Sequence, residues 1–171
     1  YSIFMSLNRG SEWSRWDLHV HTPLSFESDF GISEEERKQY DALEALEGVD
    51  KPRRHDEEIW AKYADQLESI SHIDCLGITD YFSLEGYELI NKLRATGRLD
   101  NFDVILPNIE FRLDTITADG ERINLHVIFS DELSVSDIRK EFLRNLKVTI
   151  NHGDERTLRP ESLRELGAQA K

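Results

Sequence analysis

Apolar and polar residues follow one another along this chain in patterns that predict strands separated by helices. Residues 16–20 alternate between apolar and polar, which predicts a short strand. The compact apolar run 75–79 predicts a buried parallel strand that ends at Asp80. The Asp119-Gly120 pair predicts a hairpin between two alternating segments. Further strands are expected at 103–107, 109–113, 123–129 and 147–150.

Helical patterns fill the intervals between these segments. Ser33 and Glu36 form a capping box, and Gly48 would end the helix that they begin. Further helices are expected at 84–96, at 134–146 behind the cap residue Ser134, and at 160–166. A helix over 56–70 would carry one apolar face, made of Ile59, Tyr63, Leu67 and Ile70.

Strands that alternate with helices predict an α/β fold with a mainly parallel sheet. The 171 residues are enough for one domain with a sizeable core. Four or five βα units are visible, fewer than a closed barrel needs. We therefore expect an N-terminal extension at residues 1–12, and a domain at 13–171 that continues beyond the end of this chain.

Charge and cysteine content narrow the classes of protein that remain. The net charge is −13, from 21 basic and 34 acidic residues, so the surface repels phosphate backbones and anionic membranes unless bound cations cancel the charge locally. No apolar run is long enough to cross a bilayer. The single cysteine, Cys75, excludes an internal disulfide and a cysteine-based zinc cluster, which predicts a cytoplasmic protein.

Two histidines, His19 and His21, lie at the C-terminal end of the first predicted strand, where α/β folds place their sites. Residues two apart in a strand point the same way, so the two imidazoles could share one divalent metal. Asp17 would lie on the same face and could hold an imidazole in its metal-binding tautomer. Taken alone, the pair has an equally good explanation as two solvated histidines.

Three later segments each add a side chain that can ligate a metal, and each has an ordinary alternative. Asp80 could cap the next helix, Glu110 could pair with Arg112 or Arg122, and His126 could be a hydrogen-bonded core histidine. Together with the histidine pair, they are the nitrogen and oxygen ligands that zinc, manganese and iron use. Two metals held in this way would polarise a phosphoryl oxygen and generate hydroxide, as in phosphatases and nucleases.

Four segments, in chain order, resemble motif regions of the PHP (polymerase and histidinol phosphatase) superfamily over about residues 13–130. They are Asp17-Leu18-His19-Val20-His21-Thr22, Gly77-Ile78-Thr79-Asp80, Leu106-Pro107-Asn108-Ile109-Glu110 and Leu125-His126-Val127. The resemblance implies a distorted (β/α)7 barrel, of which this chain holds the N-terminal part. It also implies phosphoester hydrolysis with two or three divalent ions (Zn, Mn or Fe) at the strand ends.

The resemblance also implies roles for individual residues. Glu110 would be a bridging carboxylate. In the phosphoesterase hypothesis, Asp80 would be a ligand or a group that orients water, and Tyr81 would assist by hydrogen bonding. Ser25 and Glu27 fall where the family often has a serine and then an extra ligand. The implied metal ligands are therefore His19, His21, Asp80, Glu110, His126 and Glu27, with Asp80 and Glu110 as the catalytic pair and Asp17 and Tyr81 outside the ligand set.

Three departures from the family pattern bear on activity. The family's Thr-Asp-His is Thr79-Asp80-Tyr81 here, so one imidazole is missing, and Asn108 stands where the family has a glycine. The family's last motif, Asp-x-His, does not occur in this sequence, although His152 could stand for a later histidine.

Further segments resemble a narrower group of large bacterial proteins in which a PHP domain precedes an ABC/AAA-like ATPase. These include Gly10-Ser11-Glu12-Trp13, Asn108-Ile109-Glu110-Phe111-Arg112-Leu113 and Ile128-Phe129-Ser130-Asp131. The resemblance implies a C-terminal ATPase region of the same protein as partner, and a phosphoester substrate with nucleic acids and nucleotides among the candidates. The 171 residues contain no phosphate-binding loop for ATP.

Three functions remain open on sequence alone. The leading hypothesis is a metal-dependent phosphoesterase, with nucleases included. The second is a catalytically degenerate module with a structural or regulatory role, which the missing imidazole favours. The third is an amidohydrolase-type enzyme, which needs a bridging carboxylated lysine, whereas Lys92, Lys140 and Lys147 lie in or beside predicted helices.

Overall fold

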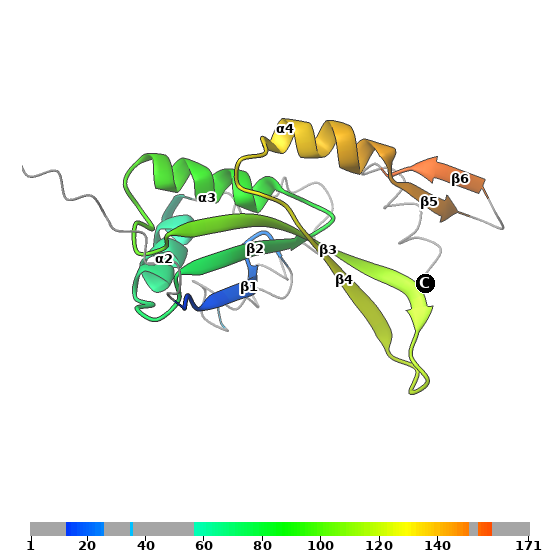
Figure 1. Cartoon of the computed structure of the whole chain (residues 1–171), viewed down its shortest axis with the longest axis horizontal. Helices are drawn as coiled ribbons and strands as arrows, with labels where there is room; N and C mark the ends of the chain where they lie inside the picture. Colours follow the sequence, from blue (N-terminus) through cyan, green and yellow to red (C-terminus); the bar gives the residue numbers. More distant parts are fainter. Residues whose placement is uncertain (1–12, 26–34, 36–56, 151–153, 159–171) are drawn as a thin grey trace, which may run out of the picture. The chain divides into compact units, whose positions relative to one another are not determined.

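The computed structural model describes residues 13–25, 35, 57–150 and 154–158 (Figure 1). The chain divides into two compact units, Tyr1–Phe129 and Ser130–Lys171, and each is described by itself. The helices predicted at 33–48 and 160–166 lie outside the described residues, apart from the single helical position Glu35. No helix in the described part of the chain is long and apolar enough to cross a membrane.

The first unit is built on a four-stranded mixed sheet with the strand order β1-β2-β3-β4, curled into a half-barrel (Figure 1). The strands β1 (Trp16–His21), β2 (Cys75–Tyr81) and β3 (Val104–Ile116) run parallel to one another, and β4 (Arg122–Ile128) runs antiparallel to β3. The prediction of an α/β fold with a mainly parallel sheet is therefore confirmed at this level.

Helix α2 (Glu57–Glu68) connects β1 to β2, and α3 (Glu85–Ala95) connects β2 to β3. The predicted face of α2 is buried at Ile59, Tyr63 and Leu67, whereas Ile70 lies beyond the helix end and is half-buried. The Tyr63 hydroxyl donates to the carbonyl oxygen of His21 at 3.1 Å. The core of the unit therefore reaches the end of β1 and fixes its backbone there.

Two predicted strand boundaries differ in the structure. Strand β2 continues through Asp80 to Tyr81, because both residues pair with β3 opposite Ile109 and Glu110. The predicted segments at 103–107 and 109–113 are one continuous strand, β3. Pro107 fits inside it, and its carbonyl oxygen accepts a hydrogen bond from the Phe129 amide at 2.9 Å.

The predicted hairpin joins β3 to β4 through a turn at Thr117–Glu121. The Gly120 amide donates to the Thr117 carbonyl at 3.0 Å, and Gly120 has a φ of +84°, a backbone conformation that favours glycine. The pairing sets Glu110 opposite His126 and Arg112 opposite Asn124. The Asp-Gly signal thus brings two polar residues of β4 beside the end of the parallel sheet.

The first helix of the second unit begins at the predicted cap residue, Ser134. The Ser134 hydroxyl accepts a hydrogen bond from the Asp137 amide at 3.0 Å and starts α4 (Val135–Asp137). The predicted helix then continues as a π-helical turn, Ile138–Phe142, and a 3-10 turn, Leu143–Asn145, instead of a regular α-helix. The predicted strand β5 (Lys147–Ile150) is confirmed, and it pairs antiparallel with β6 (Asp154–Thr157), which the sequence pattern did not indicate.

Gly77 allows β1 and β2 to approach closely. A Cβ atom at this position would lie 2.5 Å from the Leu18 carbonyl oxygen and 2.8 Å from its Cα, and these are backbone atoms that cannot rotate away. We expect Gly77→Ala to lower the free energy of unfolding by about 2–3 kcal/mol, as overpacking does. Urea unfolding followed by circular dichroism measures this change. The exposed α3 variant Asn91→Ala is the control, and an equal effect of both variants would contradict the prediction.

Candidate metal centre

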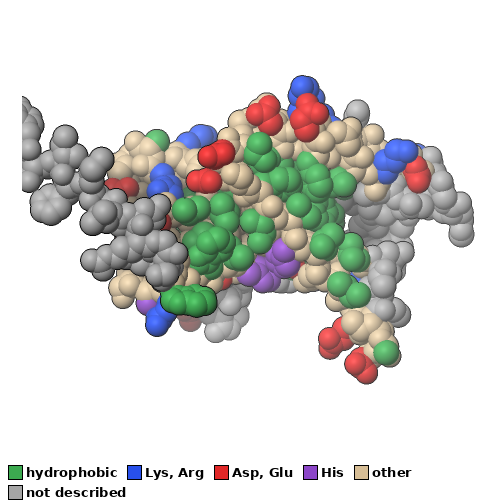
Figure 2. Space-filling model, in the orientation of Figure 1, with side chains coloured by type: hydrophobic (Ala, Val, Ile, Leu, Met, Phe, Trp, Pro, Cys, Tyr) green, Lys and Arg blue, Asp and Glu red, His purple; other side chains and the backbone are tan. Residues whose placement is uncertain are grey.

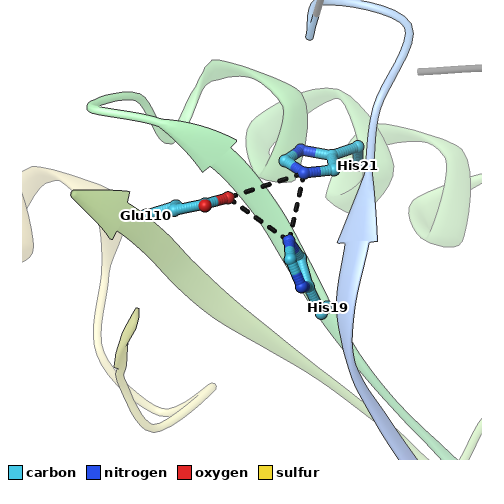
Figure 3. Close-up of side chains that lie close together, drawn as sticks. All are labelled: His19, His21 and Glu110. Atoms are coloured by element: carbon cyan, nitrogen blue, oxygen red, sulfur yellow. Dashed lines mark hydrogen bonds and ion pairs between the residues drawn. The ribbon is translucent and has the colours of Figure 1, made fainter. Parts of the chain in front are cut away.

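Three side chains from two strands meet at the C-terminal end of the parallel part of the sheet (Figure 3). His19 and His21 come from β1, and their Nε2 atoms lie 3.1 Å apart. Glu110 comes from β3, and its Oε2 lies 3.3 Å from Nε2 of His19 and 3.5 Å from Nε2 of His21. One ligand atom from each residue lies within 4.8 Å of the other two, so the group could hold a metal ion.

The strand between β1 and β3 carries the residues that bring this group together. Gly77, Thr79 and Tyr81 alternate along β2 and therefore lie on one face of it, and Tyr81 pairs with Glu110. The Asn108 amide nitrogen on β3 reaches across to the Leu18 carbonyl at 2.7 Å, and Thr79 Oγ1 lies 3.2 Å from the same carbonyl. The backbone directly before His19 is thereby tied to the strand that carries Glu110.

Glu110 is fully buried, with an exposed fraction of 0%. Its Oε1 accepts a hydrogen bond from Asn124 Nδ2 at 2.6 Å, but its Oε2 has no hydrogen-bond partner among the described residues. A buried carboxylate oxygen without a donor is costly, and a cation between the three residues would remove that cost. The environment of Glu110 therefore fits a metal ion.

The group is accessible from the side of His19. The exposed fraction of the side chain is 51% for His19 and 12% for His21. Figure 2 shows histidine side chains gathered at one place on the molecular surface. A ligand from solvent could therefore reach the group past His19, whereas Glu110 lies on its buried side.

Asp80, expected to be a ligand or a catalytic acid, lies elsewhere. It alternates with Thr79 and Tyr81, so its side chain lies on the other face of β2, and it does not belong to the His19, His21 and Glu110 group. Its carboxylate accepts hydrogen bonds from the Thr22 amide at 3.2 Å and from the Thr22 hydroxyl at 2.8 Å. Burial raises the pKa of Asp80 to about 7, against the lowering effect of these hydrogen bonds.

Tyr81 lies beside the group, in the place where the resemblance expects an imidazole. Its ring stacks on His21, with centroids 5.6 Å apart and planes inclined by 26°. The Arg112 guanidinium donates to the Tyr81 hydroxyl at 3.4 Å and lies 5.6 Å from the ring centroid. Tyr81 therefore contacts His21 by stacking and not by the hydrogen bond that the sequence analysis expects of it.

The register of β1 moves Asp17 away from the histidine face. The pairing with β2 shifts between Asp17 and Val20, so Asp17 pairs with Leu76 whereas His21 pairs with Thr79, and these partners face opposite ways. Asp17 Oδ1 accepts a hydrogen bond from the His19 backbone amide at 3.2 Å, not from its imidazole. Asp17 thus holds the strand at His19.

His126 lies next to the group without joining it. Its Nε2 is 4.0 Å from Glu110 Oε1, and its ring meets His19 edge to face with centroids 4.4 Å apart. Ser25 is buried one turn after β1. The predicted ligand Glu27 and the candidate His152 lie outside the described residues.

Asn124 and Asn108 are site residues that the sequence analysis missed. Asn124 holds Glu110, and Asn108 holds both Leu18 and the His126 ring. The signal for Asn124 was present, because alternation places it on the same face of β4 as His126. Asn108 was noted only as a departure from a family glycine.

Comparisons with family models, curated proteins and solved structures find no match to this chain. The class of protein therefore follows from fold and geometry. It is an α/β protein with a half-barrel sheet that carries a candidate His/His/Glu metal centre at its strand ends.

Proposed function

We propose that this chain is the N-terminal part of a metal-dependent phosphoesterase of the PHP type, with its metal centre at His19, His21 and Glu110. The observation that carries the proposal is the buried Glu110 Oε2, which faces two imidazole nitrogens and has no hydrogen-bond donor among the described residues. The order of the motif segments along the chain supports the family. The half-barrel supports a distorted (β/α)7 barrel continued by later residues.

Two imidazoles and one carboxylate suit zinc, manganese or iron. When bound, such an ion supplies positive charge that polarises a phosphoryl oxygen and makes a water molecule more acidic. Glu110 balances that charge, and Asn124 fixes the carboxylate by its hydrogen bond to Oε1. A second or third ion would need further ligands, for which Glu27 and residues beyond this chain are candidates.

The proposed substrate is a phosphoester, with nucleic acids and nucleotides as candidate classes. The net charge of −13 opposes the binding of such anions, so the centre is where positive charge would gather. We propose a C-terminal ATPase region of the same protein as the partner that controls access to the site.

Zinc binding tests the metal centre directly. We expect the protein to bind zinc in isothermal titration calorimetry, and His19→Ala and His21→Ala to lower the affinity at least tenfold each, because each removes one of three ligands. His72→Ala is the matched control, since His72 is exposed and precedes β2 at the opposite end of that strand. No zinc binding by the wild-type protein, or equal losses in all three variants, would reject the proposal.

A second candidate function is a metal-stabilised module without catalysis. The observation that favours it is Tyr81, whose ring occupies the neighbourhood of His21 where an imidazole is expected. Hydrolysis of bis(p-nitrophenyl) phosphate by the zinc- or manganese-loaded protein separates the two. Turnover that Glu110→Ala abolishes supports the phosphoesterase, and metal binding without turnover supports the module.

A further inference from the structure

The side-chain amide of Asn108 has a fixed orientation. Its nitrogen lies 2.7 Å from the Leu18 carbonyl oxygen, 2.8 Å from Thr79 Oγ1 and 3.2 Å from Nδ1 of His126. A backbone carbonyl can only accept hydrogen bonds, so the group at 2.7 Å must be the NH2. Rotating the amide by 180° would place Asn108 Oδ1 where the nitrogen now lies, so that it would face the Leu18 carbonyl oxygen and two acceptors would repel each other.

This orientation determines the tautomer of His126. An Nδ1–H facing the Asn108 NH2 would set two donors against each other, so Nδ1 must carry its lone pair there. A neutral imidazole has one N–H, and His126 therefore carries it on Nε2. That nitrogen is the one that faces the metal centre, 4.0 Å from Glu110 Oε1, which is too long for a hydrogen bond.

We propose that His126 is a hydrogen-bond donor at the metal centre and not a metal ligand. A nitrogen that binds a metal needs its lone pair, which the tautomer of His126 places on Nδ1 instead. The Nε2–H group is then available to an oxygen atom of an anion bound beside the metal, such as a phosphoryl oxygen. The identity of that anion rests on the proposed function, whereas the tautomer does not.

The surroundings of His126 fit a donor to a ligand that arrives from solvent. The side chain is 28% exposed, so a bound anion can reach it. The edge-to-face contact with His19 and the Asn108 hydrogen bond hold its ring from two sides. His126 also lies outside the three residues whose ligand atoms converge.

Nitrogen-15 NMR of the histidine rings tests the tautomer in the metal-free protein and again after zinc is added. His126→Gln identifies the His126 signals by their loss. We expect the Nε2–H tautomer in both states, with zinc shifting the signals of His19 and His21. An Nδ1–H tautomer, or an Nε2 that loses its hydrogen to zinc, would overturn the proposal.

Zinc and inorganic phosphate titrations test the role. We expect His126→Gln and His126→Leu to leave zinc affinity within about twofold of the wild type, and His126→Leu to weaken phosphate binding to the zinc-loaded protein about tenfold, the effect of one hydrogen bond to a charged group. His126→Gln keeps an N–H donor and should retain most of the phosphate affinity. A tenfold loss of zinc affinity in both His126 variants would make His126 a ligand and reject the proposal.

These measurements separate this inference from the proposed function. If wild-type protein binds no zinc, the metal centre fails, while the metal-free NMR spectrum still decides the tautomer. If zinc binds and phosphate affinity is the same in wild type and His126→Leu, the metal centre stands and the donor role of His126 is rejected. Circular dichroism of each variant checks that it is folded. If His126→Leu does not fold, the zinc affinity of His126→Gln still decides whether His126 is a metal ligand, because the glutamine amide cannot replace an imidazole ligand.

Discussion

Replacing Glu110 by glutamine should lower zinc affinity more than a hundredfold while leaving the metal-free protein at least as stable as the wild type. Glutamine keeps the shape of the side chain, and its Oε1 can still accept the hydrogen bond from Asn124. The substitution removes the negative charge that a cation needs. It also removes a buried carboxylate oxygen that has no hydrogen-bond donor in the described part of the chain.

The two halves of this result have one physical origin. A buried charge destabilises the empty site and stabilises the occupied one. The glutamine NH2 would face the Nε2 atoms of His19 and His21, which can accept from it, so we expect a gain of about 1 kcal/mol in the free energy of unfolding. Titration calorimetry with zinc and urea unfolding in EDTA measure the two quantities.

Asn124→Ala is the matched control for Glu110→Gln. It removes the hydrogen bond to Oε1 but leaves the charge in place, so it should reduce zinc affinity about tenfold, the scale of a residue that supports a ligand. Retained zinc affinity in Glu110→Gln, or a large loss of stability in its metal-free form, would mean that Glu110 has a structural role instead of a ligand role.

The sequence was sufficient to locate the strands of the four-stranded sheet, the helices α2 and α3, and the order of the polar residues along them. Local signals determine these features. The apolar run 75–79 forms a strand that is buried on both faces, and Gly120 adopts the positive φ of the turn that joins β3 to β4. His19, His21 and Glu110 could be predicted to share one site, because parallel strands bring their C-terminal ends to the same edge of a sheet.

The faces on which residues lie could be predicted only where the strands are regular. The shift in the β1 register moves Asp17 to the other face, and no local sequence pattern predicts this shift. The apolar run 75–79 predicts that the strand ends at Asp80, but β2 includes Asp80, and alternation directs its side chain away from the histidines. The roles of Asn108 and Asn124 depend on contacts across three strands, which a single sequence does not contain.

Asp80 gives the protein a pH dependence of stability that can be calculated in sign. Burial raises its pKa from 3.8 to about 7 in the folded protein. Because the folded state holds the proton more tightly than the unfolded chain, the stabilising contribution is complete below about pH 4. It is lost as the pH rises toward 7, by about 1.4 kcal/mol per unit and about 4 kcal/mol in total.

Asp80→Asn should remove this dependence. Asparagine resembles the protonated acid, since its oxygen can accept from the Thr22 amide and its NH2 can donate to the Thr22 hydroxyl. We expect equal stability of the two proteins near pH 4, and an advantage of up to about 4 kcal/mol for Asp80→Asn at pH 7.5. Urea unfolding in EDTA over this range gives the difference curve, in which the other titrating groups cancel.

The control for this experiment is Asp100→Asn, which changes an exposed carboxylate and should shift stability by less than about 0.5 kcal/mol at any pH. Parallel pH profiles for the wild type and Asp80→Asn would show that Asp80 is ionised at no cost in the folded protein. A rising advantage with pH would instead show that ionising the buried Asp80 carboxyl costs free energy in the folded protein.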